Sequence, residues 1–230
     1  MIIPNKIRVG TTLDYPPFTY LNQETGMYCG FDVELICRLA NNLGIEVEFI
    51  QTSWAQLEIN LTNKLFDMAG GGISLTKARR QHFLVSSPTI SDQKAILINK
   101  KHYNKIHNLA DIDIPEITVI VNSGGTNQQF VQNNIKRAVV ITTDDNLSIF
   151  AKLASGEADV MFTDLIEANY RQKLDDKLCV IIPQPPLTET IGYGYVFTQN
   201  NISLQNIIER ELNQIMHTDF FKNLKQRFFA

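Results

Sequence analysis

Two segments of the chain carry groups that suit a negatively charged ligand. The first, GGGISLTKARR at 70–80, begins with three glycines that end a predicted strand and let the backbone approach a ligand closely. Arg79 follows Thr76 by three residues, and its planar guanidinium fits a carboxylate, with the hydroxyls of Ser74 and Thr76 beside it. The Gly-Lys-Ser/Thr ending of a phosphate loop is missing. We therefore favour a carboxylate site here, and we expect Arg80 to be an ordinary surface charge.

The second segment, VNSGGTNQQF at 121–130, is typical of a strand, a Gly-Gly turn and a helix start. The free N–H groups at that helix start can bind an anion without any side chain. Asn122 lies at the end of the strand and can both donate and accept a hydrogen bond. The simpler alternative is a turn in which Thr126 caps the helix.

Four further candidates stand next to predicted strand ends. Asp14 follows the first strand within TTLDYPPFTY, where prolines and aromatic residues could form the wall of a binding cleft. Trp54, the only tryptophan, fits the first turn of a helix. Asp164 and Glu167, in VMFTDLIEANYRQ, stand one helical turn apart where a strand passes into a helix. The alternatives are a proline turn capped by Asp14, a packed Trp54, and an Asp164 that caps its helix.

The composition is that of a globular protein without a marked preference for one charge. Of 230 residues 44% are hydrophobic and 20% are charged, and the formal net charge of -3 disfavours nucleic acid as a partner. No apolar run approaches the roughly 20 residues that span a bilayer. We interpret Cys29, Cys37 and Cys179 as small packing residues, with a bridge between the first two as an alternative. The absence of metal-ligand spacings and of a Ser/His/Asp set disfavours a metalloenzyme and a hydrolase.

Strand and helix patterns alternate along the chain and restart after about residue 100. In GFDVELICRLANNLG the apolar residues recur at helical spacing, and Gly44 supplies the stop. Alternation of this kind predicts an α/β fold of mostly parallel sheets flanked by helices. We expect two lobes, 1–97 plus 196–230 and 98–195, joined by two crossover strands that act as a hinge. A ligand cleft is expected between the lobes, outside the carboxyl ends of the strands.

The order of the motifs resembles the polar amino-acid-binding proteins of bacterial transporters. The matching segments are VGTTLDYPPF, GFDVELICRLANNLG, GGISLTKARR, GGTN and ADVMFTD, and the likeness runs over roughly residues 6 to 228. It implies the type II periplasmic-binding-protein fold, with two lobes, and an aspartate near Asp164 that holds the α-amine of an amino acid. It also implies a periplasmic protein whose signal peptide has been removed, with a cytoplasmic location as the alternative.

Within that superfamily the chain looks similar to the cyclohexadienyl dehydratases at TSWAQL, IVNSGGTN and DDNLSIFAKLASGEADVMFTDLIEA. That family converts prephenate to phenylpyruvate and arogenate to phenylalanine without a metal or organic cofactor. The resemblance implies that Glu167 is the general acid and that Asn122 and Trp54 line the pocket of the reacting ring. It gives the other candidates roles in substrate binding: Asp14, Ser74, Thr76, Arg79, Lys94, Thr126 and Asp164.

A glutamate is ordinarily ionised at neutral pH, so an acid at Glu167 needs surroundings that oppose its charge. Closure of the lobes would exclude water from it, and we expect the charge of Asp164, one turn earlier, to oppose its ionisation.

The alternative function is a non-catalytic receptor of an ABC transporter, because the same fold serves both classes of protein. Such a receptor would bind an amino acid and dock on an ABC permease, whereas a dehydratase needs only its small-molecule substrate. A transferase, a detached sensor domain and a homo-oligomer also stay open.

Overall fold

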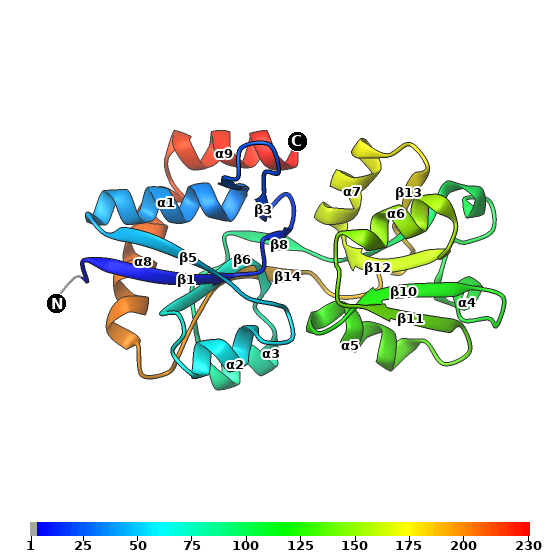
Figure 1. Ribbon diagram of the computed structural model, residues 1–230, viewed down its shortest axis with the longest axis horizontal. Coiled ribbons are helices and arrows are strands. Elements are labelled where there is room, and N and C mark those ends of the chain that lie inside the picture. The colour runs from blue at the N-terminus through cyan, green and yellow to red at the C-terminus, as the bar shows by residue number, and fades with distance from the viewer. Residues whose placement is uncertain (1–3) are drawn as a thin grey trace. The chain divides into compact units, whose positions relative to one another are not determined.

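The computed structural model describes residues 4–230, which divide into two compact units. The first unit comprises residues up to Ser91 together with Ile191–Ala230, and the second is Asp92–Thr190. Each unit has one main sheet with helices on both of its faces (Figure 1). The chain therefore passes between the units twice.

The main sheet of the first unit consists of β1 (Lys6–Thr11), β5 (Glu46–Gln51), β6 (Met68–Ser74), β7 (Leu84–Val85), β8 (Ile90–Asp92) and β14 (Ile191–Phe197). Its order is β5, β1, β6, β14 and β7, with β8 paired to β14. β1 is parallel to both β5 and β6, whereas β14 is antiparallel to β6 and β7. The predicted parallel pairing therefore holds where helices connect the strands, and the strand that returns from the second unit runs the other way.

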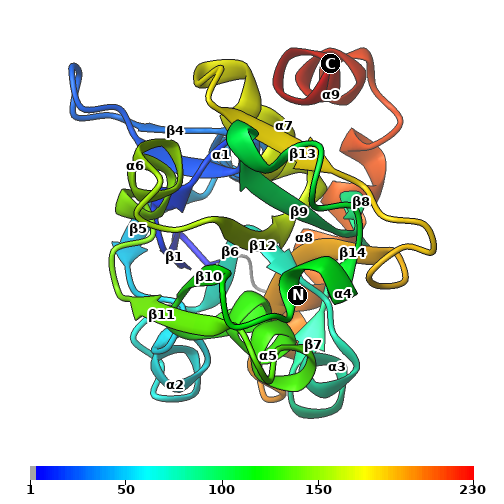
Figure 2. The same ribbon diagram turned by 90° about the vertical axis from the view of Figure 1, so that its right-hand side faces the viewer.

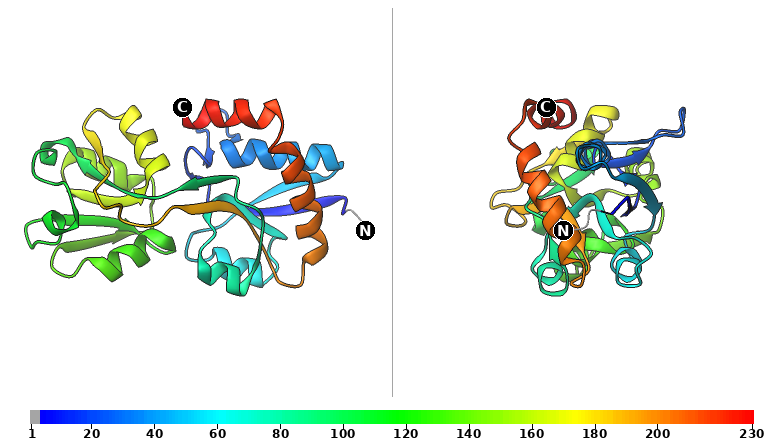
Figure 3. Two further views of the ribbon diagram at one scale, coloured as in Figure 1. Left: turned by 180° about the vertical axis from the view of Figure 1, so that it is seen from behind. Right: turned by 90° about the vertical axis from the view of Figure 1, so that its left-hand side faces the viewer.

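The helices of the first unit are α1 (Phe31–Leu43), α2 (Leu57–Thr62), α3 (Lys77–His82), α8 (Ile202–Ile215) and α9 (Asp219–Phe229). α1 confirms the helical spacing, because Val33, Ile36 and Leu39 are buried and Gly44 ends the helix with a φ of 67°. α1 packs against α8 and α9 on one side of the sheet, and α2 and α3 lie on the other side (Figures 1 and 3).

The helix expected from Trp54 onward is shorter than predicted. α2 begins at Leu57, and Trp54 lies in the turn that precedes it. Only Leu57 and Leu61 of this helix are buried, so packing supports little more than one turn.

The interpretation of the cysteines as packing residues is wrong for Cys37, which lies on the exposed face of α1. Cys29 and Cys179 are partly buried. All three thiols are free, so the alternative bridge between Cys29 and Cys37 is not formed.

A small antiparallel sheet connects β1 to α1. It consists of β2 (Asp14–Tyr15), β3 (Thr19–Leu21) and β4 (Tyr28–Cys29). The loop between β3 and β4 extends away from the main sheet of this unit (Figure 2). Asp14, the first residue of β2, stands three residues after the end of β1.

The sheet of the second unit consists of β9 (Lys94–Asn99), β10 (Thr118–Asn122), β11 (Val139–Thr143), β12 (Val160–Asp164) and β13 (Leu178–Ile181). The order is β11, β10, β12, β9 and β13, with β10 parallel to its neighbours and β9 antiparallel to both of its own. Its helices are η1 (Lys100–His102), α4 (Leu109–Ile112), α5 (Gly125–Asn134), α6 (Ser148–Ser155) and α7 (Leu165–Leu174).

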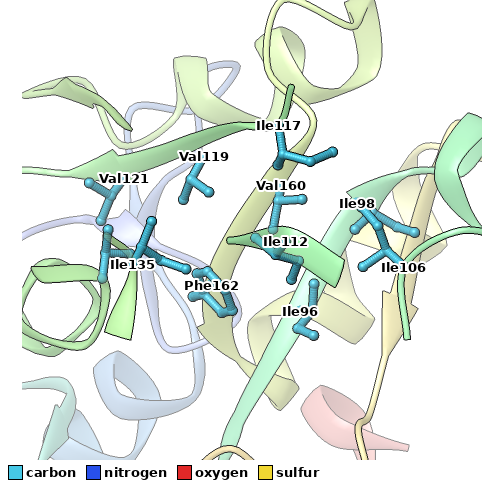
Figure 4. Packing of buried hydrophobic residues seen from close by; sticks show 11 residues of the cluster. Ile96, Ile98, Ile106, Ile112, Ile117, Val119, Val121, Ile135, Val160 and Phe162 are labelled. Atoms are coloured by element: carbon cyan, nitrogen blue, oxygen red, sulfur yellow. The ribbon is translucent and has the colours of Figure 1, made fainter. Parts of the chain in front are cut away.

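Side chains of β9 alternate between two apolar clusters. Ile96 and Ile98 join valines of β10 and β12 in a cluster that includes residues of α4 and α5 (Figure 4). Ala95 and Leu97 point to the opposite face and join residues of α6 and α7. A strand that is buried on both faces in this way is apolar throughout, which explains why KAILIN carries no polar alternation.

Shortening one side chain of the first of these clusters is expected to lower stability modestly. Ile96→Val removes one methylene from a residue that is 0% exposed, so the free energy of unfolding should fall by about 0.5–1.5 kcal/mol. Urea unfolding followed by far-UV circular dichroism measures the change. Ile182→Val is the control, because Ile182 is 47% exposed. An equal loss in both variants would contradict this account of the core.

Candidate functional site

In the first unit, three predicted residues lie along one edge of the main sheet. Because β5, β1 and β6 are parallel neighbours, their carboxyl ends meet at the same edge. Asp14 follows β1, Trp54 follows β5, and Ser74 ends β6. Ligands of open α/β sheets bind outside this edge.

Tyr15 is the centre of an aromatic group at this edge. The ring of Phe18 stacks on it at a centroid distance of 5.4 Å, and Trp54 meets it edge to face at 5.3 Å. Tyr15 and Phe18 are buried, whereas Trp54 is only partly buried. Trp54 is therefore held in place by Tyr15 while part of its surface stays exposed.

The glycines that end β6 are required by the packing of the protein itself. Gly71 and Gly72 have φ angles of 120° and 69°, and a Cβ on them would lie 2.6 Å from Thr11 Oγ1 and 2.5 Å from the Tyr15 ring. The N–H of Gly72 donates to the carboxylate of Asp32 at 2.7 Å, and burial raises the pKa of Asp32 to about 6. Close approach to a ligand is thus not needed to explain these glycines.

Arg79 is only 6% exposed and is held by groups of its own unit. Its Nε donates to Glu58 Oε1 at 2.9 Å, and its Nη1 donates to the carbonyl of Ser74 at 2.8 Å. Thr76 caps α3 by accepting from the N–H of Arg79 at 3.2 Å. The carboxylate that Arg79 binds in this structure is that of Glu58. Binding of a ligand carboxylate by Arg79 stays a prediction. Arg80 is exposed, as expected.

In the second unit, Lys94 is the centre of a buried polar cluster. β9 is antiparallel to β12, so Lys94 at the start of β9 lies opposite Asp164 at the end of β12. Lys94 Nζ lies 2.7 Å from Asp164 Oδ1, and the two side chains are 8% and 6% exposed. Nζ also donates to Thr126 Oγ1 at 3.0 Å and to Asn127 Oδ1. The structure therefore brings together Lys94, Thr126 and Asp164 and adds Asn127.

Asn122 ends β10 and is buried, and its Oδ1 accepts from Asn127 Nδ2 at 3.4 Å. The alternative in which Thr126 caps the following helix is wrong. Gly124 is the N-cap of α5, with a φ of 77°, and Thr126 lies inside the first turn. Gly124, with its positive φ, starts the helix two residues before Thr126. The Thr126 hydroxyl is therefore not the cap, and it accepts a hydrogen bond from Lys94 Nζ.

Asp164 occupies the N-cap position of α7, but its side chain makes no capping hydrogen bond. Its carboxylate is engaged by Lys94 instead. The interpretation of Asp164 as the side chain that caps its helix is therefore wrong. Lys94 is the cation paired with Asp164, and the effect of Asp164 on the ionisation of Glu167 stays a prediction.

Glu167 is 0% exposed, one turn into α7. Thr163 Oγ1 donates to its Oε2 at 2.6 Å, and Arg171 Nη2 lies 3.6 Å from its Oε1. The guanidinium of Arg171 stacks over the ring of Phe150 at 3.7 Å. Because side chains alternate along β12, Thr163 and Asp164 leave the strand on opposite faces. Glu167 thus belongs to a separate group from Lys94 and has a cation as its charged partner.

Four side chains that contact Glu167, Arg79 or Lys94 are not predicted from the sequence: Thr163, Arg171, Glu58 and Asn127. Arg171 follows Glu167 by four residues on α7, a spacing that places side chains together on a helix, so it could have been found, whereas Thr163 lies in β12, to which that spacing does not apply. Glu58 and Asn127 contact Arg79 and Lys94 through the pairing of distant segments, and no local pattern marks them.

Across residues 4–230, no three His, Cys, Asp or Glu side chains are grouped so that they could hold a metal ion. In the same part of the chain, no helix is long and apolar enough to cross a membrane.

Two α/β units, each with a parallel core and an antiparallel strand next to it, define a protein of the type II periplasmic-binding-protein fold. The family model of bacterial extracellular solute-binding proteins, family 3, matches residues 7–230, and the chain belongs to this family.

Relatives of the chain include an enzyme and binding proteins. The chain is 39% identical to a cyclohexadienyl dehydratase of Pseudomonas aeruginosa over 180 residues, which are 78% of this chain and 67% of that protein. It is 27% identical to the L-cystine-binding protein TcyA of Bacillus subtilis, over 88% of this chain and 76% of that one. Its structure is similar to that of AncCDT-1, an ancestral amino acid-binding protein and precursor of cyclohexadienyl dehydratase. That match has a TM-score of 0.91 and 29% identity, and it covers 98% of this chain and 96% of the other.

Proposed function

We propose that this chain is a cyclohexadienyl dehydratase that converts prephenate to phenylpyruvate, arogenate to phenylalanine, or both. The observation that carries the proposal is the 39% identity to the dehydratase of Pseudomonas aeruginosa. The matching stretch of sequence includes the segments around Trp54, Asn122 and Glu167, the three residues to which we assign the chemistry.

The reaction needs one acid and a fixed geometry. The bond between the ring and its carboxylate breaks and releases CO2, and its electron pair forms the new double bond of the ring. The hydroxyl on the opposite ring carbon accepts a proton and leaves as water. Because the product ring is aromatic, the reaction is intrinsically downhill, and a positioned acid contributes on the order of 100- to 10,000-fold.

Glu167 is the proposed acid. Its burial removes the water that would stabilise a carboxylate. Thr163 donates to its Oε2, whereas Arg171, 3.6 Å from its Oε1, favours the ionised form, so the proposed role requires burial to outweigh this cation. We assign the ring pocket to Asn122 and Trp54.

The remaining predicted residues are proposed to bind and orient the substrate. In the first unit these are Asp14, Ser74, Thr76 and Arg79, and in the second they are Lys94, Thr126 and Asp164. The N–H groups at the start of α5 suit a carboxylate, and Lys94 would have to give up one of its three contacts to bind it as well. No metal or organic cofactor takes part in the proposed reaction.

We propose that the protein acts in the periplasm, because its family consists of extracellular solute-binding proteins. An ABC permease is a partner only if the second function below holds.

The second candidate function is that of an amino-acid receptor without catalysis. It is favoured by the similarity to an L-cystine-binding protein and to an ancestral amino acid-binding protein. In such a receptor Asp164 would hold the α-amine of the ligand, and Lys94 would have to give up part of its contact with that carboxylate.

One experiment separates the two functions. The protein is incubated with prephenate near neutral pH, where the uncatalysed reaction is slow, and phenylpyruvate is measured over time. Binding of arginine, lysine, glutamine and cystine is measured in parallel by calorimetry. We expect turnover far above the background. Background conversion combined with tight binding of one of these amino acids would reject the dehydratase in favour of the receptor.

A further inference from the structure

The first turn of α7 is capped from outside the helix. An aspartate at the N-cap normally accepts from the second or third N–H of its own helix. Asp164 stands at this position, yet its carboxylate is turned to Lys94 and makes no capping hydrogen bond. The free N–H groups of α7 therefore need other acceptors.

Asp92 and Gln93 supply these acceptors. Oδ2 of Asp92 accepts from the N–H of Ile166 at 2.8 Å, and the carbonyl of Gln93 accepts from the N–H of Leu165 at 2.9 Å. Lys94, the next residue, pairs with Asp164. Three consecutive residues, which we call the 92–94 segment, thus hold the three residues at which β12 passes into α7.

The hydrogen bond between Asp92 and Ile166 joins α7 to the point at which the chain enters the second unit. Asp92 is the last residue of β8 and the first of the second unit, so it lies where the chain passes from one unit into the other. Its side chain reaches a helix 74 residues further along the chain. The residue after Ile166 is Glu167.

The carboxylate of Asp92 is itself buried, at 6% exposure. Both of its oxygens accept backbone hydrogen bonds, Oδ1 from the N–H of Gln93 at 2.8 Å and Oδ2 from Ile166. Burial raises the pKa of Asp92 to about 6, with a further increase from the charge of Asp164 and an opposing effect of Lys94. A group with such a pKa changes its charge close to neutral pH.

We propose that Asp92 is a positioning residue that fixes the first turn of α7 and, through it, the place of Glu167. The inference rests on the proposed function for the role of Glu167. Asp92 acts through α7 and does not touch the substrate. Since a misplacement of a catalytic group by about 1 Å can cost about 100-fold in rate, loss of this contact should lower turnover without changing substrate binding much.

The test compares Asp92→Asn and Asp92→Ala with wild type. The asparagine keeps one acceptor and the alanine keeps none, so kcat should fall by about 10-fold in the first and by about 100-fold in the second. KM should stay within about 3-fold of wild type in both. The matched control is Asp113→Asn, because Asp113 also accepts backbone hydrogen bonds within the second unit, from Lys136, Arg137 and Ala138. This control should leave kcat unchanged.

The pH dependence of kcat is a second measurement. It should differ between wild type and Asp92→Asn if Asp92 positions Glu167, and it should be the same in both if Asp92 only stabilises the fold. Above a pH of about 6 both oxygens of Asp92 are acceptors, and below it one of them carries a proton and competes with an N–H donor. Wild type should therefore lose turnover on the acid side, with an inflection near 6 that Asp92→Asn lacks. The charged groups around Asp92 and Glu167, namely Lys94, Asp164 and Arg171, are the same in both proteins.

Hydrogen exchange keeps the test independent of the proposed function. The amides of the first turn of α7 should exchange at least about 10-fold faster in Asp92→Ala than in wild type, with no change in Asp113→Asn. If wild type fails to convert prephenate, the proposed function is rejected, and exchange alone decides whether Asp92 holds α7. Unchanged exchange in α7, or a fall in kcat that matches the loss of folded protein, would overturn the inference. Should the alanine variant not fold, the asparagine variant decides by the same criteria.

Discussion

Glu167→Gln is expected to lower the turnover of prephenate by about 100- to 10,000-fold while the affinity for the substrate stays close to that of wild type. Glutamine has nearly the shape of glutamate, and its side-chain oxygen can still accept from Thr163 Oγ1. What it lacks is an acidic proton. The barrier to loss of the ring hydroxyl should therefore rise, whereas the contacts that hold the substrate should not change.

The measurement combines initial rates of phenylpyruvate formation with the dissociation constant of phenylpyruvate from calorimetry. Glu157→Gln serves as the matched control, because Glu157 is an exposed glutamate of the same unit that pairs with Lys152. The control should retain full turnover. If Glu167→Gln kept a substantial part of the wild-type rate, the acid would have to be another group.

A loss of folded protein must be separated from a loss of chemistry in this variant. Arg171 lies 3.6 Å from Oε1 of Glu167 and is itself largely buried, so the glutamine removes the carboxyl group that can compensate this cation. Breaking a buried ion pair in this way is costly. Urea unfolding of wild type and variant gives the folded fraction, and rates are compared per folded molecule.

Much of the fold could be predicted because it follows from local patterns. The apolar spacing of GFDVELICRLANNLG and its final Gly44 determine α1 without reference to the rest of the chain. The same holds for the runs that form β10 and β12, which are apolar on both faces. Strand ends then give the sheet edge at which Asp14 and Trp54 lie in the first unit and, separately, the edge at which Asn122 lies in the second.

The contacts of the candidate site could be predicted less well, because they depend on which distant segments pair. Asp164 looks like a helix cap from its neighbours alone, and only the antiparallel pairing of β9 with β12 shows that Lys94 takes its carboxylate. Arg79 looks free to grip a ligand until Glu58 is seen beside it. Charged side chains near strand ends thus have competing partners that local spacing does not reveal.

Lys94→Met is expected to lower the free energy of unfolding of the second unit by about 3–5 kcal/mol. Lys94 and Asp164 are 8% and 6% exposed, so the substitution leaves a carboxylate buried without its cation. Thr126 and Asn127 lose their shared donor at the same time. The methionine fills the space of the lysine stem, so the loss should come from the uncompensated charge and from unmade hydrogen bonds and not from a cavity.

The double variant Lys94→Met with Asp164→Leu distinguishes these causes. Replacing both members of a buried ion pair by apolar side chains is often neutral or stabilising, so the double variant should recover most of the lost stability. Lys6→Met is the control, because Lys6 and Glu48 form an exposed pair at 2.8 Å and such pairs contribute little. If Lys94→Met behaved like this control, the buried pair would not be important for stability.

The two units can be followed separately in this experiment. Trp54 is the only tryptophan and lies in the first unit, so its fluorescence reports unfolding there. Far-UV circular dichroism reports the helices of both units. The loss caused by Lys94→Met should therefore appear in circular dichroism at urea concentrations at which the Trp54 signal is still native. A simultaneous shift of both signals would mean that the two units unfold as one cooperative body, and the effect of the ion pair would then be spread over the whole chain.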